Sequence, residues 1–198
     1  MSRPRSGTGA DLTSEADVAI EIQPYRQAPA SYRGYDADVA PAARALADRI
    51  CLQDSRLRVE HIGSTAVPGC GGKGYIDLLL TYPDGHLDAA KAALETLGFG
   101  RQSSRDPFPE ERPMRVGTVV HEGRRFPVHV HVIAATAPEA AELLWFRDRL
   151  RADESLRAAY EAEKRRIVAE GVIDGVDYSN AKASFIDGVL AVRRQGSA

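Results

Sequence analysis

Residues 59–80 read VEHIGSTAVPGCGGKGYIDLLL, which predicts a strand, a long glycine-rich turn and a second strand. Glycines allow the oxygens of a ligand to approach backbone N–H groups, and Ser64, Thr65 and Lys73 add two hydroxyls and one cation. Asp77 lies in the second apolar run, where a carboxylate is costly to bury unless it pairs or holds a metal. The stretch therefore predicts a phosphate-and-metal site. A tight turn with an incidental carboxylate is the simpler alternative.

The same residues carry a family resemblance. The run HIGSTAVPG at 61–69, followed by Lys73 and by Ile76-Asp77-Leu78, resembles the signature of the GrpB-like family, and the likeness extends over roughly residues 18–190. This family belongs to the polymerase-beta-like nucleotidyltransferase superfamily, and some members are fused to a dephospho-coenzyme A kinase domain. The resemblance implies that Gly63-Ser64 open a phosphate loop and that Asp77 holds a divalent metal, Mg²⁺ or Mn²⁺ rather than Zn²⁺.

Position 79 departs from the superfamily pattern. Related nucleotidyltransferases hold Mg²⁺ with two carboxylates at i and i+2 on this strand, whereas here Asp77 is followed by Leu79. A single carboxylate binds metal more weakly and puts two-metal phosphoryl chemistry in doubt.

Length and composition indicate one ordinary globular domain. The chain has 198 residues, of which 43% are hydrophobic and 27% charged, enough to bury a core. Its formal net charge of −2 argues against a general nucleic-acid-binding surface, which needs a basic excess. No apolar run approaches the ~18 residues of a membrane span. Cys51 and Cys70 match no metal-binding spacing, so we expect reduced thiols in a cytoplasmic protein.

Residues 1–17 are expected to form a disordered tail and residues 18–194 the domain. Hydrophobic periodicity predicts strands at 18–23, 56–62, 75–82, 114–120 and 125–133. It predicts helices at 31–52 with a kink or break at Pro41, at 86–97, from 137 through at least 150, at 154–171 and at 178–193. This order indicates an α/β (α+β) fold with a mixed sheet flanked by helices and a helical C-terminal portion. The family resemblance implies, more specifically, a fold of the nucleotidyltransferase type.

The strand at 125–133 carries a second group of candidate residues. His129 and His131 share one face of this strand, while the intervening valines face the core. With His61 and Asp77 nearby, a metal site of three histidines and one carboxylate is conceivable, and imidazole would favour Zn²⁺ or Fe over Mg²⁺. Alternatively, the histidines line a polar groove and form hydrogen bonds with a substrate.

Two helical pairs complete the candidate set. Arg147 and Arg151 are i,i+4 neighbours that could bind phosphate or lie on a solvated helix face. Tyr178 and Lys182 have the same spacing and could reach the groove or cover the edge of the core. Tyr160 and Lys164 also resemble the family's C-terminal pattern.

Together these observations predict a nucleotidyltransferase-like protein that binds a nucleotide or another phosphorylated small molecule. It would transfer a nucleotidyl group to an acceptor by positioning and charge stabilisation. A non-catalytic nucleotide- or coenzyme-binding module and a histidine-metal hydrolase are the alternatives. The expected catalytic residues are Asp77, His129 and His131, the expected phosphate ligands are Gly63, Ser64, Thr65, Lys73, Arg147 and Lys182, and the expected metal ligands are Asp77, His61, His129 and His131.

Overall fold

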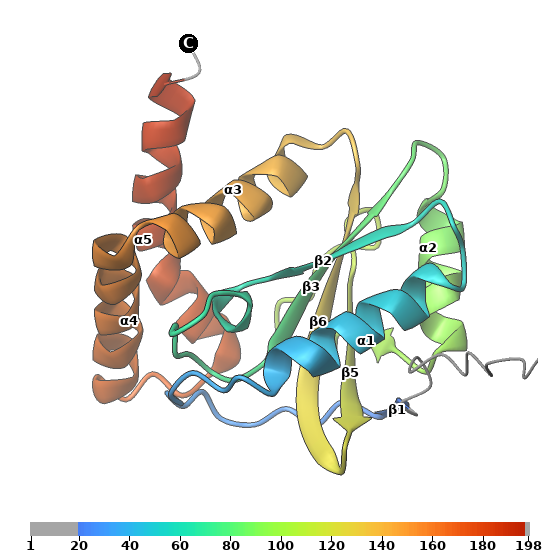
Figure 1. Ribbon diagram of the computed structural model, residues 1–198, viewed down its shortest axis with the longest axis horizontal. Helices are drawn as coiled ribbons and strands as arrows, with labels where there is room; N and C mark the ends of the chain where they lie inside the picture. The colour runs from blue at the N-terminus through green and yellow to red at the C-terminus, as the bar shows by residue number, and fades with distance from the viewer. Residues whose placement is uncertain (1–19, 197–198) are drawn as a thin grey trace, which may run out of the picture.

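A six-stranded mixed sheet forms the centre of the molecule (Figure 1). The computed structural model describes residues 20–196, so the expected tail at residues 1–17 lies outside the described residues. The strands are β1 (Glu21–Gln23), β2 (Arg58–Ile62), β3 (Ile76–Tyr82), β4 (Gly100–Arg101), β5 (Met114–His121) and β6 (Arg124–Ala134). The helices are α1 (Val39–Cys51), α2 (Leu87–Thr96), α3 (Pro138–Ala152), α4 (Glu154–Ala169) and α5 (Gly175–Gly196). The predicted mixed sheet with a helical C-terminal portion is confirmed.

The sheet order places the two informative strands side by side. The order is β1-β5-β6-β3-β2, with β4 paired to β5. The β3–β6 pair is parallel, whereas the other pairs are antiparallel. Asp77 on β3 is in register with His129 on β6, and Leu79 with His131. The parallel pairing therefore aligns the acidic strand with the histidine strand.

Each face of the sheet is covered by different helices. Helices α1 and α2 pack on the face that carries Ile76, Leu78 and Leu80, together with the valines of β6. Helix α3 covers the other face, where Leu79 is fully buried against apolar side chains of β2, β6 and α3. Strand alternation sends Leu79 and Asp77 to this second face, as the sequence predicted.

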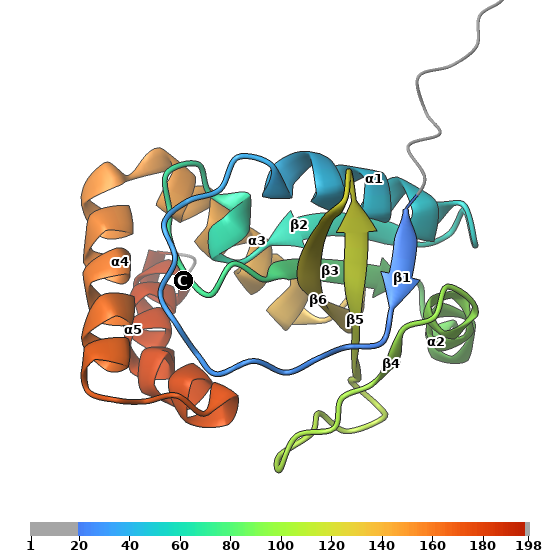
Figure 2. The same ribbon diagram turned by 90° about the horizontal axis from the view of Figure 1, so that it is seen from below.

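The helical C-terminal portion is joined to the sheet domain by the segment between β1 and α1. This segment crosses beneath the sheet toward α4 and α5 (Figure 2). The N–H of Ala30 donates to the carbonyl of Ile173 at 2.7 Å, and Arg33 forms an isolated bridge with Gly72. None of the described helices is long and apolar enough to cross a membrane.

The helix predicted for residues 31–52 is too long at its start. The structure begins α1 at Val39, because the backbone of Arg33 is extended and pairs with Gly72 at N–O distances of 2.7 and 2.9 Å. The kink predicted at Pro41 is also wrong. Pro41 lies in the first turn of α1, where no N–H has an intrahelical partner and proline is therefore tolerated.

Candidate functional site

The glycine-rich turn, β3 and helices α4 and α5 enclose a small pocket, which we call the lysine pocket. Its volume of about 40 Å³ makes it a small cavity. The chain has four lysines, and three of them line this pocket. The pocket is lined by Gly63, Ser64, Lys73, Tyr75, Asp77, Tyr160, Lys164, Tyr178 and Lys182.

Gly63 allows the turn to lie against the carboxylate of Asp77. Its φ is +71°, and a Cβ at this position would lie 2.5 Å from Asp77 Oδ2. Both the positive φ and the close approach exclude larger residues. Gly72 has a related role, because a Cβ there would lie 2.4 Å from Ser64 Oγ and 3.6 Å from Lys164 Nζ. The glycines thus bring a hydroxyl, an ammonium and a carboxylate to one place.

A hydrogen-bonded chain holds the base of the turn. The hydroxyl of Thr65 donates to the carbonyl of Tyr75 at 2.8 Å, so the contact at 3.0 Å between His61 Nε2 and Thr65 Oγ1 requires the imidazole to donate. Burial lowers the pKa of His61 to about 4, although the charge of Asp77 opposes this shift. His61 is therefore a neutral side chain that supports the turn, and neither it nor Thr65 lines the pocket.

Lys164 is built into the wall of the pocket. Its side chain is 1% exposed, and Nζ lies 3.2 Å from Cys70 Sγ and donates to the carbonyl of Gly71. Burial lowers the pKa of Lys164, whereas the neighbouring thiol of Cys70 opposes this shift. Glu161, one turn earlier on α4, accepts the N–H of Gly71 at 2.8 Å. Helix α4 thus fixes the glycine-rich turn from behind.

Lys73 and Lys182 contact aromatic rings instead of carboxylates. Lys73 Nζ lies 4.8 Å from the ring centre of Tyr75 and 5.1 Å from that of Tyr178, and Lys182 Nζ lies 5.4 Å from the latter. In the described part of the chain, neither lysine forms an ion pair. Burial and the charge of Lys182 lower the pKa of Lys73 to about 8, and burial lowers the pKa of Lys182. The charge of Asp77 opposes both shifts, but burial outweighs it.

Asp77 belongs to a chain of three side chains that leads away from the pocket. His129 Nδ1 lies 3.4 Å from Asp77 Oδ1, and His129 Nε2 lies 3.1 Å from the hydroxyl of Tyr25. Burial opposes ionisation of Asp77, but hydrogen bonding and charge from His129 outweigh it and lower the pKa of Asp77. The predicted common face of Asp77 and the histidines is confirmed, because Val128, Val130 and Val132 are buried behind them.

His131 lies two residues beyond His129 on β6, further from the lysine pocket. It is in register with Leu79, and its ring meets Phe108 edge-on with ring centres 5.7 Å apart. Its Nδ1 is buried without a hydrogen-bond partner, and burial lowers the pKa of His131 to about 4. His131 is therefore neutral and does not line the lysine pocket.

The four expected metal ligands do not form a cluster. His61 is in register with Leu78, on the face of the sheet opposite Asp77, and His129 already contacts the Asp77 carboxylate. Residues 20–196 contain no group of three or more His, Cys, Asp or Glu side chains that could hold a metal ion. The described side chains therefore do not supply enough ligands for the protein to hold a metal ion by itself.

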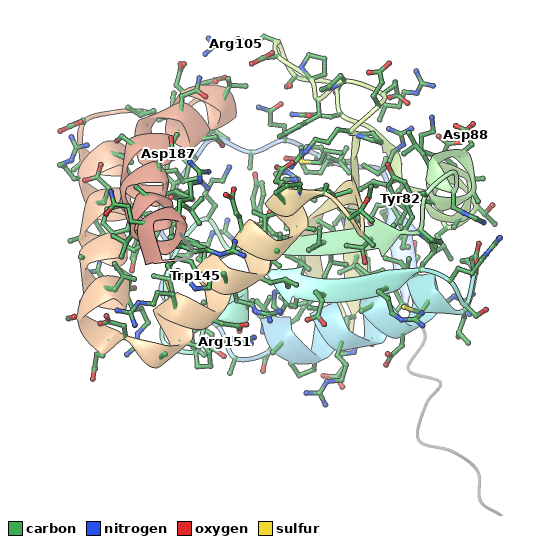
Figure 3. The ribbon with its side chains drawn as sticks, turned by 90° about the horizontal axis from the view of Figure 1, so that it is seen from above. Tyr82, Asp88, Arg105, Trp145, Arg151 and Asp187 are labelled. Carbon is green, nitrogen blue, oxygen red and sulfur yellow. The ribbon has the colours of Figure 1, made fainter. Side chains whose placement is uncertain are left out.

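Arg147 lies away from the pocket, contrary to its expected place among the phosphate ligands. Its guanidinium contacts Glu60 and Asp148, each at 2.8 Å, and the carbonyl of His61 at 3.1 Å. The sequence could not reveal this pairing, because β2 and α3 meet only in the folded chain. Arg151, labelled in Figure 3, donates to the carbonyl of Ala66 at 2.8 Å and stabilises the turn.

Lys164 and Tyr160 are pocket residues to which the sequence analysis gave no role. They lie within a strongly charged helix, where a lysine is usually solvated. The sequence contains one pattern that could have identified these two residues. The spacing Tyr160-x-x-x-Lys164 on α4 recurs as Tyr178-x-x-x-Lys182 on α5, and all four side chains converge on the pocket.

A larger, mainly apolar cavity of about 650 Å³ lies between α3, α4 and α5. Its lining includes Trp145, labelled in Figure 3, together with Leu156, Phe185 and Val192. It lacks the converging cations of the lysine pocket, which is therefore the candidate site.

Comparison with known proteins gives a consistent family relationship. The family model described as GrpB protein matches residues 20–191. A UPF0157 protein of Streptomyces coelicolor is 37% identical over 140 residues, which cover 71% of this chain and 69% of the relative. A UPF0157 protein of Halalkalibacterium halodurans is 31% identical over 143 residues, covering 72% and 70%.

One solved structure shows the fold relationship. The crystal structure of conserved protein GrpB from Enterococcus faecalis has a TM-score of 0.60 and 22% identity, and the match covers 80% of this chain and 94% of that one. At this identity the likeness shows the fold alone. A Cid1 poly(U) polymerase is also matched, with a TM-score of 0.44 and 11% identity, covering 65% and 41%.

Proposed function

This chain belongs to the GrpB protein family, and we propose that its lysine pocket binds the phosphates of a nucleotide or another phosphorylated small molecule for nucleotidyl transfer. One observation carries the proposal. Three of the chain's four lysines converge on a pocket that also presents Ser64 and a glycine-rich turn, and two of them, Lys73 and Lys182, form no ion pair in the described part of the chain.

Lysines, a serine hydroxyl and glycine-rich backbone form a common type of phosphate site. The two unpaired ammonium groups supply charge, and Ser64 at the start of the turn supplies a hydrogen-bond donor. The cavity of about 40 Å³ accommodates a single phosphoryl group. The remainder of a nucleotide would lie outside it, beside Asp77 and His129.

A divalent ion would come to this site on the phosphates of the nucleotide. Mg²⁺ is commonly bound through one or two carboxylates together with substrate phosphates, and the described residues offer no complete ligand cluster. In this proposal the protein binds and orients the phosphates, and its lysines stabilise the charge that develops on the leaving group.

A second candidate is a binding module without turnover. The observation in its favour is Leu79, which is fully buried against the apolar side chains of α3 and leaves Asp77 as the only carboxylate among residues 20–196 that lines the pocket. A module would bind nucleotide and release no pyrophosphate, so measurement of pyrophosphate distinguishes the two candidates.

A thermal-shift experiment with a matched control tests the proposal. The four ribonucleoside triphosphates and their nucleosides are compared on the wild type, Lys182→Met and Lys91→Met, with and without EDTA. Lys91 is the remaining lysine and pairs with Asp88 on α2. We expect at least one triphosphate to raise the melting temperature of the wild type and of Lys91→Met, but not of Lys182→Met. Equal shifts in all three proteins, or shifts by nucleosides alone, would contradict phosphate binding here.

A further inference from the structure

The side chains of Tyr25, His129 and Asp77 form a relay beside the lysine pocket. The Tyr25 hydroxyl lies 3.1 Å from His129 Nε2, and the opposite ring nitrogen, Nδ1, lies 3.4 Å from Asp77 Oδ1. A potential nucleophile is therefore within hydrogen-bond reach of a base, and a carboxylate lies beside the opposite nitrogen of that base. This arrangement of three groups is the structural signature of an activated nucleophile.

Aromatic packing fixes the relay in place. The ring of Tyr75 meets His129 and Tyr25 edge-on, with ring centres 5.1 and 6.5 Å apart. Thr118 donates to the carbonyl of Pro24 at 3.4 Å, which holds the residue before Tyr25 against β5. The tyrosine is thus positioned by neighbours on β5, on β6 and directly before β3 and not by its own segment alone.

The relay and the pocket share Asp77. Tyr75, in the wall of the pocket, contacts the other two relay residues, His129 and Tyr25. A ligand with its terminal phosphates among the lysines would therefore have its inner phosphate near Asp77 and Tyr75, beside the relay.

We propose that Tyr25 is a covalent acceptor of the nucleotidyl group. This inference rests on the proposed function, because it requires a nucleoside triphosphate in the lysine pocket. The phenol oxygen of Tyr25 attacks the α-phosphorus, and a new phosphorus–oxygen bond forms. The bond between the α-phosphorus and the oxygen that bridges to the β-phosphate breaks, and that oxygen leaves with the electron pair as pyrophosphate. The products are a tyrosyl–nucleotide phosphodiester and pyrophosphate.

The proton of the phenol has a defined destination. In its neutral form, with the proton on Nδ1, His129 accepts it at Nε2, and the carboxylate of Asp77 stabilises the resulting imidazolium through Nδ1–H. Burial raises the pKa of Tyr25 above its usual range, so the phenol is protonated at neutral pH and a base must remove its proton. Lys73 and Lys182 compensate the charge of the leaving pyrophosphate.

Radiolabel transfer tests the proposal. The full chain is incubated with each of the four ribonucleoside triphosphates labelled at the α-phosphate, denatured, and examined for label that remains on the polypeptide. Peptide mass spectrometry of the wild type then locates the adduct. The compared proteins are the wild type, Tyr25→Phe and Tyr35→Phe. Tyr35 is 37% exposed and serves as the matched control.

We expect label on the wild type and on Tyr35→Phe, an adduct on Tyr25, and at least a tenfold loss of label in Tyr25→Phe. Label that persists in Tyr25→Phe or maps to another residue overturns the proposal. A triphosphate that raises the melting temperature but leaves no covalent label overturns this inference and leaves the proposed function standing. Absence of any nucleotide binding overturns both.

Discussion

The imidazole of His129 lies 3.4 Å from the carboxylate of Asp77, across the parallel pair β3–β6. The contact follows directly from register, because paired residues on adjacent strands point to the same face. It gives Asp77 a nitrogen partner at the position where the sequence suggested a metal. The carboxylate therefore contacts an imidazole at the edge of a cationic pocket.

Replacement of Asp77 by Asn should lower the free energy of unfolding by ~1–3 kcal/mol at neutral pH, the cost of losing a charge-assisted contact. The folded-state pKa of Asp77 is lowered, so its contribution is fully present above the ordinary aspartate value of about 3.9, begins to decline below it and is lost only as pH falls through the folded-state pKa. Urea unfolding of wild type and variant at pH 7, 5 and about 3.5 should show the same difference at pH 7 and 5 and a difference that has only begun to shrink at the lowest pH. If the variant is as stable as the wild type at pH 7, the contact between Asp77 and His129 does not contribute to the stability of the fold.

Affinity for a phosphate ligand should fall as pH rises through about 8, the pKa of Lys73. Lysine is charged below its pKa, so the ammonium attracts phosphate at pH 7 and is largely neutral at pH 9. We expect a loss of about five- to tenfold in affinity over this range, or about 1 kcal/mol. Calorimetric titrations of wild type and Lys73→Arg measure it, because arginine stays charged throughout. A pH-independent affinity in the wild type contradicts the prediction.

Lys164 and Lys182 should differ in their contribution to stability, although both line the pocket. Lys164→Met leaves the carbonyl of Gly71 without its ammonium donor and should destabilise the fold by ~1–3 kcal/mol. Lys182→Met removes a partly buried ammonium that forms no ion pair in the described part of the chain, so its free energy of unfolding should be unchanged or higher. Urea unfolding of both variants without ligand measures the contrast. Equal destabilisation would mean that Lys182 also has an unrecognised structural partner.

Gly63→Ala should destabilise the protein more than Gly85→Ala. Both glycines have positive φ, +71° and +78°, but only a Cβ at Gly63 would lie 2.5 Å from a carboxylate oxygen, whereas nothing lies within 4 Å of one at Gly85. Backbone strain costs ~1 kcal/mol or more at each site, and displacement of Asp77 adds to it only at Gly63. Thermal unfolding of the two variants gives the difference. Identical melting temperatures would show that the turn relaxes away from Asp77.

The sequence predicted the sheet well because its signals are local. Alternation along β3 and β6 placed Asp77, His129 and the buried valines correctly, since strand geometry sends alternate residues to opposite faces. Helix α1 was predicted too early at Ser31 because helical spacing continues through residues that actually pair with the turn at Gly72. That pairing joins segments about forty residues apart, so no local pattern reveals it.

The candidate site was predicted in part for the same reason. Ser64, Lys73 and Asp77 follow from one continuous stretch, whereas Lys164 reaches the pocket only through the packing of α4 behind the turn. Arg147 was placed at the phosphates because its helical spacing suited them, but Glu60 on β2 is its partner. Contacts between segments far apart in the sequence determine where the side chains of Lys164 and Arg147 lie.

The measurement that tests the central claim most directly is a calorimetric titration of inorganic tripolyphosphate into the wild type, Lys73→Met/Lys182→Met and Lys91→Met. The same titrations are repeated at about 0.05 M and about 0.5 M salt, because added ions screen exposed charge. We expect saturable binding to the wild type and Lys91→Met that weakens with salt, and no detectable binding to the double variant. Equal affinity of the double variant and the wild type, or no binding to the wild type at either salt concentration, would contradict it.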